Sequence, residues 1–282
     1  MSPEHFEEHL CLLKKFRLCR LSEVPESMRP GSVVVTFDDG YADNLHCAAQ
    51  LLNKHEIPAT FFLTSGYLGG YGEFWWDELE RRLASTALNH GTLELVVEGR
   101  ALRWDMAAVD GAEFPWLPVY YELYDLLQPL QHARRLRILR EIPGAPQILR
   151  ARESHRVLNL SEVSDLASME RIEIGAHTVT HPRLASLIAT TQLAEMRESR
   201  RFLEEAAGCV VRSFSYPFGD RGHYNDESVQ MAREAGFSVA CTTAPGTVER
   251  ASSRFELPRV VVGDMDGDQF EHLLNSCMHN AK

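Results

Sequence analysis

Two apolar runs on either side of an amphipathic segment constrain the fold of this chain most strongly. Residues 33–37 and 59–63 are largely continuous apolar segments, which is typical of strands buried on both faces of a parallel sheet. Residues 43–55, between them, carry apolar side chains at helical spacing. A strand, a helix and a second strand in this order predict a parallel β/α unit.

The pattern changes between residues 69 and 155. A helix is expected to open at 73–79, a hairpin is expected over 93–104 around Glu98-Gly99, and residues 120–142 have helical character. No linker-like composition flanks this stretch. We therefore predict one domain over residues 1–282, with 69–155 as a mainly helical insertion packed on it. A two-domain organisation is the alternative.

The β/α alternation then returns, which predicts an α/β fold of the barrel type. Ser161 is expected to cap one helix and Asn225 another, and Gly208 to end a third. Strands are expected at 171–174, 210–216, 237–241 and 257–262, and helices at 191–207, 225–235 and 268–277.

Composition narrows the classes of function. A length of 282 residues suits a single α/β barrel, and a net charge of −11 argues against binding nucleic acid or anionic membranes through charge. The six cysteines form no CxxC pair. The sequence has no apolar stretch of 18 residues, so it predicts no transmembrane helix. The first residues do not resemble a secretion signal, so we expect a cytoplasmic location. If a targeting segment is missing, an envelope-associated location is the alternative. The sequence does not predict the oligomeric state.

The first polar cluster, Thr36–Gly40 (TFDDG), follows the first predicted strand. Its adjacent carboxylates, Asp38 and Asp39, repel each other and are costly to remove from water unless a cation or a proton compensates them. Adjacent side chains leaving a strand point in different directions, so one carboxylate can bind a metal while the other faces a substrate. The alternative is a simple turn before the next helix, since Asp and Gly favour turns.

The second cluster contains His177 and His181, again just after a predicted strand. Two histidines four residues apart can converge on one ion if the chain between them takes a helical turn. For each histidine alone, the alternative is an ordinary core or surface residue. Both clusters follow strands, and the carboxyl ends of barrel strands are where active sites assemble. One aspartate and two histidines leave a metal position open for water, and the other aspartate can act as general base.

These clusters carry a family resemblance. The sequence resembles the polysaccharide deacetylases of the NodB-homology type, carbohydrate esterase family 4. Thr36–Gly40 is similar to the first motif of that family, and His177–His181 is similar to the second. Ser213–Gly219 (SFSYPFG) is similar to a variant of the third motif. The resemblance covers most of the chain outside the insertion, including Arg233–Phe237.

This resemblance implies a distorted (β/α)7-type barrel and a set of roles. Asp39, His177 and His181 would bind a divalent metal, commonly zinc in the family. Asp38 would be the general base. The backbone N–H of Phe218 would help to hold the oxyanion.

The chain departs from the family pattern at two points. The third motif usually has an arginine where Ser215 stands, and that arginine orients the catalytic base. Arg259 would replace it by reaching in from a neighbouring strand; the alternative is that Arg259 is a surface residue.

The second departure concerns the general acid. The late histidine of the family, which acts as the acid, has no clear match here. His223 is one candidate, and His272 and His279 are weaker ones. The alternatives are that each is an exposed histidine and that Asp38 serves both steps.

We therefore predict a metal-dependent hydrolase that removes an N-acyl group, expected to be N-acetyl, from an amino sugar in a glycan or glycan precursor. Its partner would be a carbohydrate carrying an N-acyl amino sugar, and its cofactor a divalent metal, expected to be Zn²⁺. A deformylase or other C–N amide hydrolase on the same fold is one alternative. A non-catalytic carbohydrate-binding relative is another, although such a protein would have no reason to retain the unfavourable carboxylate pair.

Overall fold

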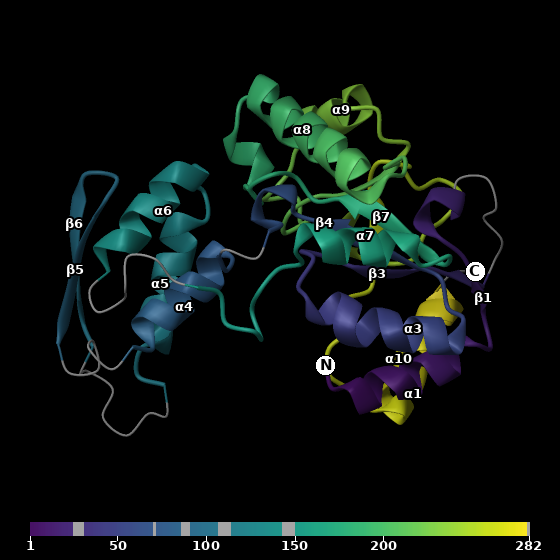
Figure 1. Ribbon diagram of the computed structural model, residues 1–282. Helices are drawn as coiled ribbons and strands as arrows, with labels where there is room; N and C mark the ends of the chain where they lie inside the picture. Colours follow the sequence, from purple (N-terminus) through teal and green to yellow (C-terminus); the bar gives the residue numbers. More distant parts are fainter. Residues whose placement is uncertain (25–30, 70–71, 86–90, 107–113, 143–149, 281–282) are drawn as a thin grey trace. The chain divides into compact units, whose positions relative to one another are not determined.

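The chain forms two compact units. A computed structural model describes residues 1–24, 31–69, 72–85, 91–106, 114–142 and 150–280 (Figure 1). The barrel unit consists of Met1–Gly69 and Val157–Lys282, and the inserted unit of Gly70–Arg156. The limits of the inserted unit lie close to the predicted 69 and 155. That this unit packs on the barrel stays a prediction.

A six-stranded parallel sheet forms the centre of the barrel unit. In spatial order the strands are β3 (Val35–Phe37), β4 (Ala59–Leu63), β7 (Ile172–Ala176), β8 (Ser213–Ser215), β9 (Val239–Pro245) and β10 (Leu257–Arg259). The spatial order follows the chain order without reversal, as in a barrel. Arg259 Nη1 of β10 donates to Thr36 Oγ1 of β3 at 3.2 Å, so the sheet curls until its first and last strands meet. The predicted barrel-type α/β fold is confirmed.

Some elements differ from their predicted form. The expected strand at 33–37 is two strands, because β2 (Ser32–Val33) pairs with β1 (Arg17–Leu18) whereas β3 pairs with β4. β3 is also only half-buried, so the expectation of a strand buried on both faces was wrong there. The following helix begins as a π-helical segment, η2 (Asn44–Ala49), and continues as α3 (Gln50–His55). β8 and β10 are shorter than predicted.

β4 is buried on both faces, as its apolar sequence predicted. Successive side chains of a strand point to opposite faces. Phe61 and Leu63 therefore join the cluster beneath the helices, while Phe62 packs in a second cluster with Cys241. Gly175 on β7 leaves room for this ring, because a Cβ there would lie 2.4 Å from Phe62 Cδ1.

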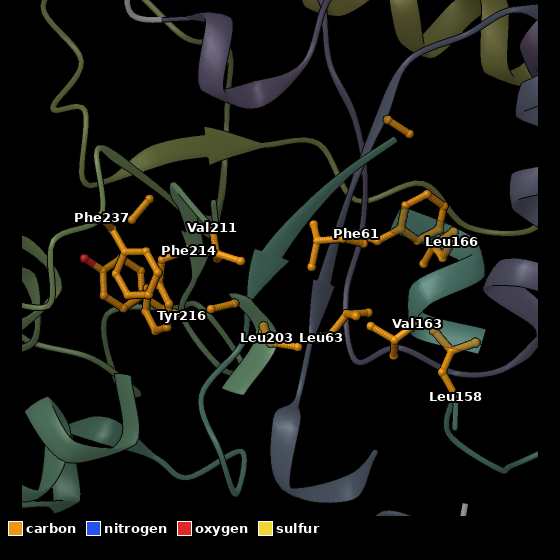
Figure 2. Packing of buried hydrophobic residues seen from close by; sticks show 14 of the residues in the cluster. Phe61, Leu63, Leu158, Val163, Leu166, Leu203, Val211, Phe214, Tyr216 and Phe237 are labelled. Carbon is orange, nitrogen blue, oxygen red and sulfur yellow. The ribbon is translucent and has the colours of Figure 1, made fainter. Parts of the chain in front are cut away.

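Three aromatic rings of the main hydrophobic cluster lie together. Figure 2 shows Phe214, Tyr216 and Phe237 gathered together, apart from Leu63, Leu158 and Val163. The rings of Phe214 and Phe237 stack with centroids 5.0 Å apart. This packing anchors β8, the strand with which the third sequence motif begins.

Three helices of the barrel unit lie between the inserted segment and β10 along the chain: α7 (Leu160–Ser168), α8 (Ala189–Ala207) and α9 (Asp226–Glu234). α7 and α8 pack on β7, and α8 packs on α9 (Figure 1). The cap expected at Ser161 was wrong. Asn159 caps α7 instead. Its side chain accepts from Glu162 N at 3.0 Å, and the Glu162 side chain accepts from the backbone N–H of Asn159. The Asn225 cap and the left-handed Gly208 are confirmed.

The terminal helices lie together. Ser2 caps α1 (Pro3–Leu13), which packs on α3 and on α10 (Gly267–Asn280). The short 3₁₀ segments of this unit are η1 (Leu21–Glu23), η3 (Ser65–Tyr67) and η5 (Leu184–Ser186). Within the described ranges, no helix is both long and apolar enough to cross a membrane. The expected cytoplasmic location stays a prediction.

The inserted unit contains α4 (Trp75–Leu83), β5 (Thr92–Val97), β6 (Arg100–Asp105), α5 (Leu117–Leu127) and α6 (His132–Glu141). The predicted hairpin is confirmed: β5 and β6 are antiparallel, and Glu98 and Gly99 both have positive φ, as a two-residue hairpin turn requires. The single helix expected over 120–142 was wrong. It is interrupted near Pro129, which lacks the N–H that a continuous helix needs.

Candidate metal centre

The residues singled out in the sequence gather at the carboxyl ends of the parallel strands. Asp38 and Asp39 follow β3, and His177 follows β7. Ser215 ends β8, and Arg259 ends β10. The strands are parallel and adjacent, so their carboxyl ends share one edge of the sheet, where barrel folds place their sites.

Arg259 holds the Asp38 carboxylate through both of its oxygens. Nη1 donates to Oδ1 at 2.8 Å and Nη2 donates to Oδ2 at 2.7 Å. The planar guanidinium fork matches a carboxylate, which makes such bidentate pairs strong and directional. The same side chain also donates to Thr36 Oγ1 (3.2 Å), Ser215 Oγ (3.0 Å) and the Thr242 carbonyl (2.7 Å). With its side chain only 15% exposed, Arg259 is not a surface residue.

The charge of Arg259 decides the ionisation of Asp38. Burial alone would raise the pKa of Asp38. The Arg259 guanidinium and its hydrogen bonds, with smaller contributions from His177 and Ser215, outweigh burial and hold the pKa of Asp38 well below its usual range. Asp38 is therefore a fixed, ionised acceptor at neutral pH.

Asp39, His177 and His181 meet at one point. Asp39 Oδ1 lies 3.6 Å from His177 Nε2 and 3.4 Å from His181 Nε2. Ligand atoms of all three lie within 4.8 Å of one another. Ligands about 2.0–2.2 Å from a zinc ion in tetrahedral geometry lie about 3.3–3.6 Å apart. One carboxylate oxygen and two imidazole nitrogens at these separations fit a divalent metal.

The hydrogen bonding of His177 prepares it as a ligand. Its Nδ1 lies 2.7 Å from the Ser215 carbonyl oxygen, which can only accept. Nδ1 must therefore carry the hydrogen, and the Nε2 lone pair faces Asp39, as in metal sites with a backbone-oriented histidine. Burial lowers the pKa of His177, which favours the neutral imidazole that binds metals.

The backbone at the site is unusual for its residue types. Asp39 (φ 73°), Thr178 (φ 65°) and His181 (φ 51°) lie in the left-handed region without being glycine. Such conformations cost free energy and cluster at functional sites. The two histidines converge without the helical turn that the sequence analysis named as the condition, because residues 177–182 form an irregular loop in which Thr178 and His181 have positive φ.

The loop after β8 places a third element beside the histidines. The Phe218 ring packs edge-on against His181 with centroids 4.6 Å apart. Phe218 has a φ of 63°, and its carbonyl accepts from Thr243 Oγ1 at 2.7 Å. The next residue, Gly219, is required there, because a Cβ would lie 2.6 Å from Thr243 N. The Phe218 peptide is thus held by β9.

His223 lies in the same loop, and its ring centroid is 4.8 Å from that of Phe218. Its Nδ1 is 2.7 Å from Asp220 Oδ1, which is an ion-pair distance, although the contact lacks hydrogen-bond geometry. His272 lies exposed on α10. The side chain of His279 lies outside the described part of the chain. Of these candidates, His223 is connected to His181 through the ring of Phe218.

Comparison with known sequences agrees with this geometry. The family model described as polysaccharide deacetylase matches residues 26–92 and 150–240, which is more than half of the chain. The chain belongs to the polysaccharide deacetylase family. The matched ranges contain Asp38, Asp39, His177 and His181, and they end before Arg259. The family model therefore does not cover Arg259 in this deacetylase family member. The sequence left it as either a replacement for the motif arginine or a surface residue, and its contact with Asp38 comes from the structure.

Individual relatives are more distant. YxkH of Bacillus subtilis (strain 168), whose name assigns it provisionally to the polysaccharide deacetylases, is 31% identical over 106 residues, 37% of either chain. The deacetylase PplD of Streptococcus pyogenes is 18% identical, covers 98% of this chain and 86% of its own, and has a TM-score of 0.59. IcaB from Ammonifex degensii is 16% identical, with 99% and 90% covered and a TM-score of 0.61. These solved structures share the fold.

Several residues that shape the site in this deacetylase family member were missed by sequence reasoning. Thr36 and Thr242 bind Arg259, Thr243 binds the Phe218 carbonyl, and Glu195 binds the loop between the histidines. Glu195 lies on α8, where an acidic residue on a partly exposed face gives no signal. Thr36 stands two residues before Asp38 and was named only as part of the TFDDG cluster, so its contact with Arg259 was not predicted. A polar residue in an apolar strand is a signal that could have pointed to this contact.

Proposed function

We propose that this chain is a metal-dependent hydrolase that removes an N-acetyl group from an amino sugar in a glycan or a glycan precursor. One observation carries the proposal. Asp39 forms a cluster with His177 and His181, and the residue before it, Asp38, has a carboxylate that Arg259 holds in one orientation. Membership of the polysaccharide deacetylase family supports the reaction and the class of substrate.

We assign Asp39, His177 and His181 as the metal ligands, and Zn²⁺ as the ion that they bind. Two imidazole nitrogens and one carboxylate oxygen are a donor set that zinc accepts in catalytic sites, where a fourth position stays open. A bound divalent ion would supply Lewis acidity, which polarises a carbonyl and lowers the pKa of water.

We assign Asp38 as the general base. It accepts a proton from the water whose oxygen forms the new bond to the acyl carbon. The C–N bond then breaks, acetate leaves, and the sugar nitrogen takes up a proton to leave as the amine. Arg259 and Ser215 both donate to the Asp38 carboxylate and keep it in one orientation during proton transfer, which is the positional control that general-base catalysis requires.

Two groups of the loop after β8 complete the assignment. The Phe218 N–H donates to the oxyanion, and its position depends on the Thr243 contact to the Phe218 carbonyl. We assign His223 as the candidate proton donor to the leaving amine, because its ring packs on Phe218 and Asp220 lies beside its Nδ1. If His223 is dispensable for turnover, Asp38 serves both steps.

The test combines two variants of the metal-loaded protein. Asp38→Asn should keep the metal and lose about 10²- to 10⁴-fold in the rate of acetate release from N-acetylglucosamine oligosaccharides, because the amide cannot accept the proton. His177→Ala should lose both the metal and the activity. Metal content is measured by elemental analysis and acetate by a coupled assay.

Asp43→Asn is the matched control, because Asp43 is an exposed carboxylate that accepts from the side chain of its neighbour Asn44 and has no role in the proposed reaction. It should retain full activity. Native turnover by Asp38→Asn would overturn the assignment of the base. Release of formate from N-formyl sugars, with no acetate release by the wild-type protein, would replace the proposed substrate with that of a deformylase.

A further inference from the structure

The loop between the two histidine ligands needs an external support, because it has no regular secondary structure. Residues 178–180 separate His177 from His181, and Thr178 and His181 both have positive φ. A backbone in this conformation is unfavourable for residues other than glycine and persists only when its surroundings impose it. The contacts of the loop therefore decide where the imidazole of His181 lies.

One side chain from a different element contacts the loop three times. Glu195 of α8 accepts from Val179 N at 2.8 Å and from Thr180 N at 2.9 Å, both through Oε2. Its other oxygen, Oε1, accepts from Thr180 Oγ1 at 2.6 Å. A carboxylate that binds two successive backbone N–H groups fixes the orientation of both peptides, and hydrogen bonds to a charged acceptor are strong.

The helix that carries Glu195 is itself firmly packed. Its neighbours Gln192, Met196 and Ser199 are all buried, and Gln192 Nε2 donates to the Leu187 carbonyl at 2.9 Å. α8 also packs on β7, the strand from which the loop leaves. Glu195 therefore connects the loop to a rigid support and not to a mobile surface.

The opposite side of the loop is bound by the segment after β4. Ser65 N donates to the Thr178 carbonyl at 3.1 Å, and Gly66 N donates to the Val179 carbonyl at 2.9 Å. The carbonyls of the loop are thus held by one element and its N–H groups by Glu195. Without Glu195, the N–H groups of Val179 and Thr180 would lose their acceptor, whereas the carbonyls of the loop would keep their contacts with Ser65 and Gly66.

We propose that Glu195 is a positioning residue for the metal centre, which acts by fixing the loop between His177 and His181 before the ion binds. This inference rests on the metal site in the proposed function. Its consequence is thermodynamic: removal of Glu195 leaves all three ligands in place but weakens metal binding, because the loop must be ordered at the moment of binding. Substitution of residues that orient metal ligands typically lowers affinity by about 10- to 100-fold.

The experiment measures Zn²⁺ affinity by competition with a chromophoric chelator, using the full chain. Glu195→Ala should raise the dissociation constant about 10- to 100-fold. Glu195→Gln should fall between Ala and wild type, because its one carbonyl oxygen can still accept from both N–H groups. Glu198→Ala is the matched control, since Glu198 is an exposed acid on the same helix, and it should bind zinc like wild type.

A second readout separates positioning from general loss of structure. The Co²⁺-substituted Glu195→Ala protein should show an altered visible absorption band, which reports ligand geometry, while the metal-free variant keeps the far-UV circular dichroism of wild type. If Glu195→Ala does not fold, Glu195→Gln and Thr180→Val decide. Thr180→Val removes only the hydroxyl contact and should weaken binding less than tenfold.

The outcomes are distinguishable. Unchanged zinc affinity and an unchanged cobalt spectrum in folded Glu195→Ala would overturn the positioning role while leaving the metal site intact. Equal losses in Glu195→Gln and Glu195→Ala would also overturn it, because charge and not loop geometry would then be the cause. Failure of the wild-type chain to bind zinc or cobalt would overturn the metal site in the proposed function itself.

Discussion

The pairing of Arg259 with Asp38 should be a large contribution to the stability of the barrel unit, and it can be tested without substrate. Arg259→Met keeps the length of the side chain but removes every hydrogen bond of the guanidinium. Asp38 would then keep the longer hydrogen bond from Ser215 Oγ, at 3.3 Å. Its carboxylate would be left in a site where burial opposes ionisation.

The expected magnitude follows from the geometry of the pair. Removal of one partner of a buried pair costs about 3–5 kcal/mol, because the remaining charge is uncompensated. The Asp38 side chain is 27% exposed and that of Arg259 15%. Solvent therefore compensates part of the loss, and we expect the lower end, about 3 kcal/mol, for Arg259→Met. The double variant Asp38→Asn/Arg259→Met should be less destabilised than the sum of the single variants, with a coupling of about 2 kcal/mol.

The assay is urea unfolding of the metal-free protein, with a chelator present so that bound ion does not contribute. Far-UV circular dichroism follows the whole chain. All four tryptophans, Trp75, Trp76, Trp104 and Trp116, belong to the inserted unit, so tryptophan fluorescence reports that unit separately. Arg259→Met should change the circular dichroism transition and leave the fluorescence transition in place if the two units unfold independently.

The double-mutant cycle decides the outcome. A coupling below about 0.5 kcal/mol would refute the reasoning, since independent sites usually add within that margin. It would mean that Arg259 and Asp38 contribute to stability separately, and that the bidentate contact orients the carboxylate without stabilising the fold.

Two further predictions concern other parts of the chain. Gly66→Ala should weaken zinc binding about tenfold, because its Cβ would lie 2.5 Å from the Val179 carbonyl oxygen. Gly263→Ala is the control, because its Cβ would meet nothing within 4 Å. Wild-type zinc affinity in Gly66→Ala would contradict the prediction. Burial, with a smaller effect of Arg135, lowers the pKa of His132 from 6.5 to about 4, so the unfolded chain binds more protons in this window and stability is lost as the pH falls through it. After allowance for solvent contact, we expect the free energy of unfolding to be about 1 kcal/mol lower at pH 5 than at pH 7.5. Tryptophan fluorescence during urea unfolding measures this loss, which should be absent in His132→Gln. An equal loss in both proteins would contradict the prediction.

Much of the fold could be predicted because local patterns agree with the tertiary structure. The apolar run of β4, the Asn225 cap of α9 and the Glu98-Gly99 turn depend on neighbours within a few residues, and all three were predicted. Errors arose where distant residues decide. The strand predicted at 33–37 divides because its two parts pair with different strands, and the cap of α7 falls on Asn159 through a reciprocal bond with Glu162.

The same division holds at the candidate site. The sequence alone determined which residues could bind a metal, because paired carboxylates and closely spaced histidines after buried strands are local features. Only the tertiary structure decided how they are held. Arg259 meets Asp38 across 221 positions, and Glu195 binds the histidine loop from another helix. Contacts of this kind depend on the curl of the sheet and the packing of α8, which no periodicity in the chain encodes.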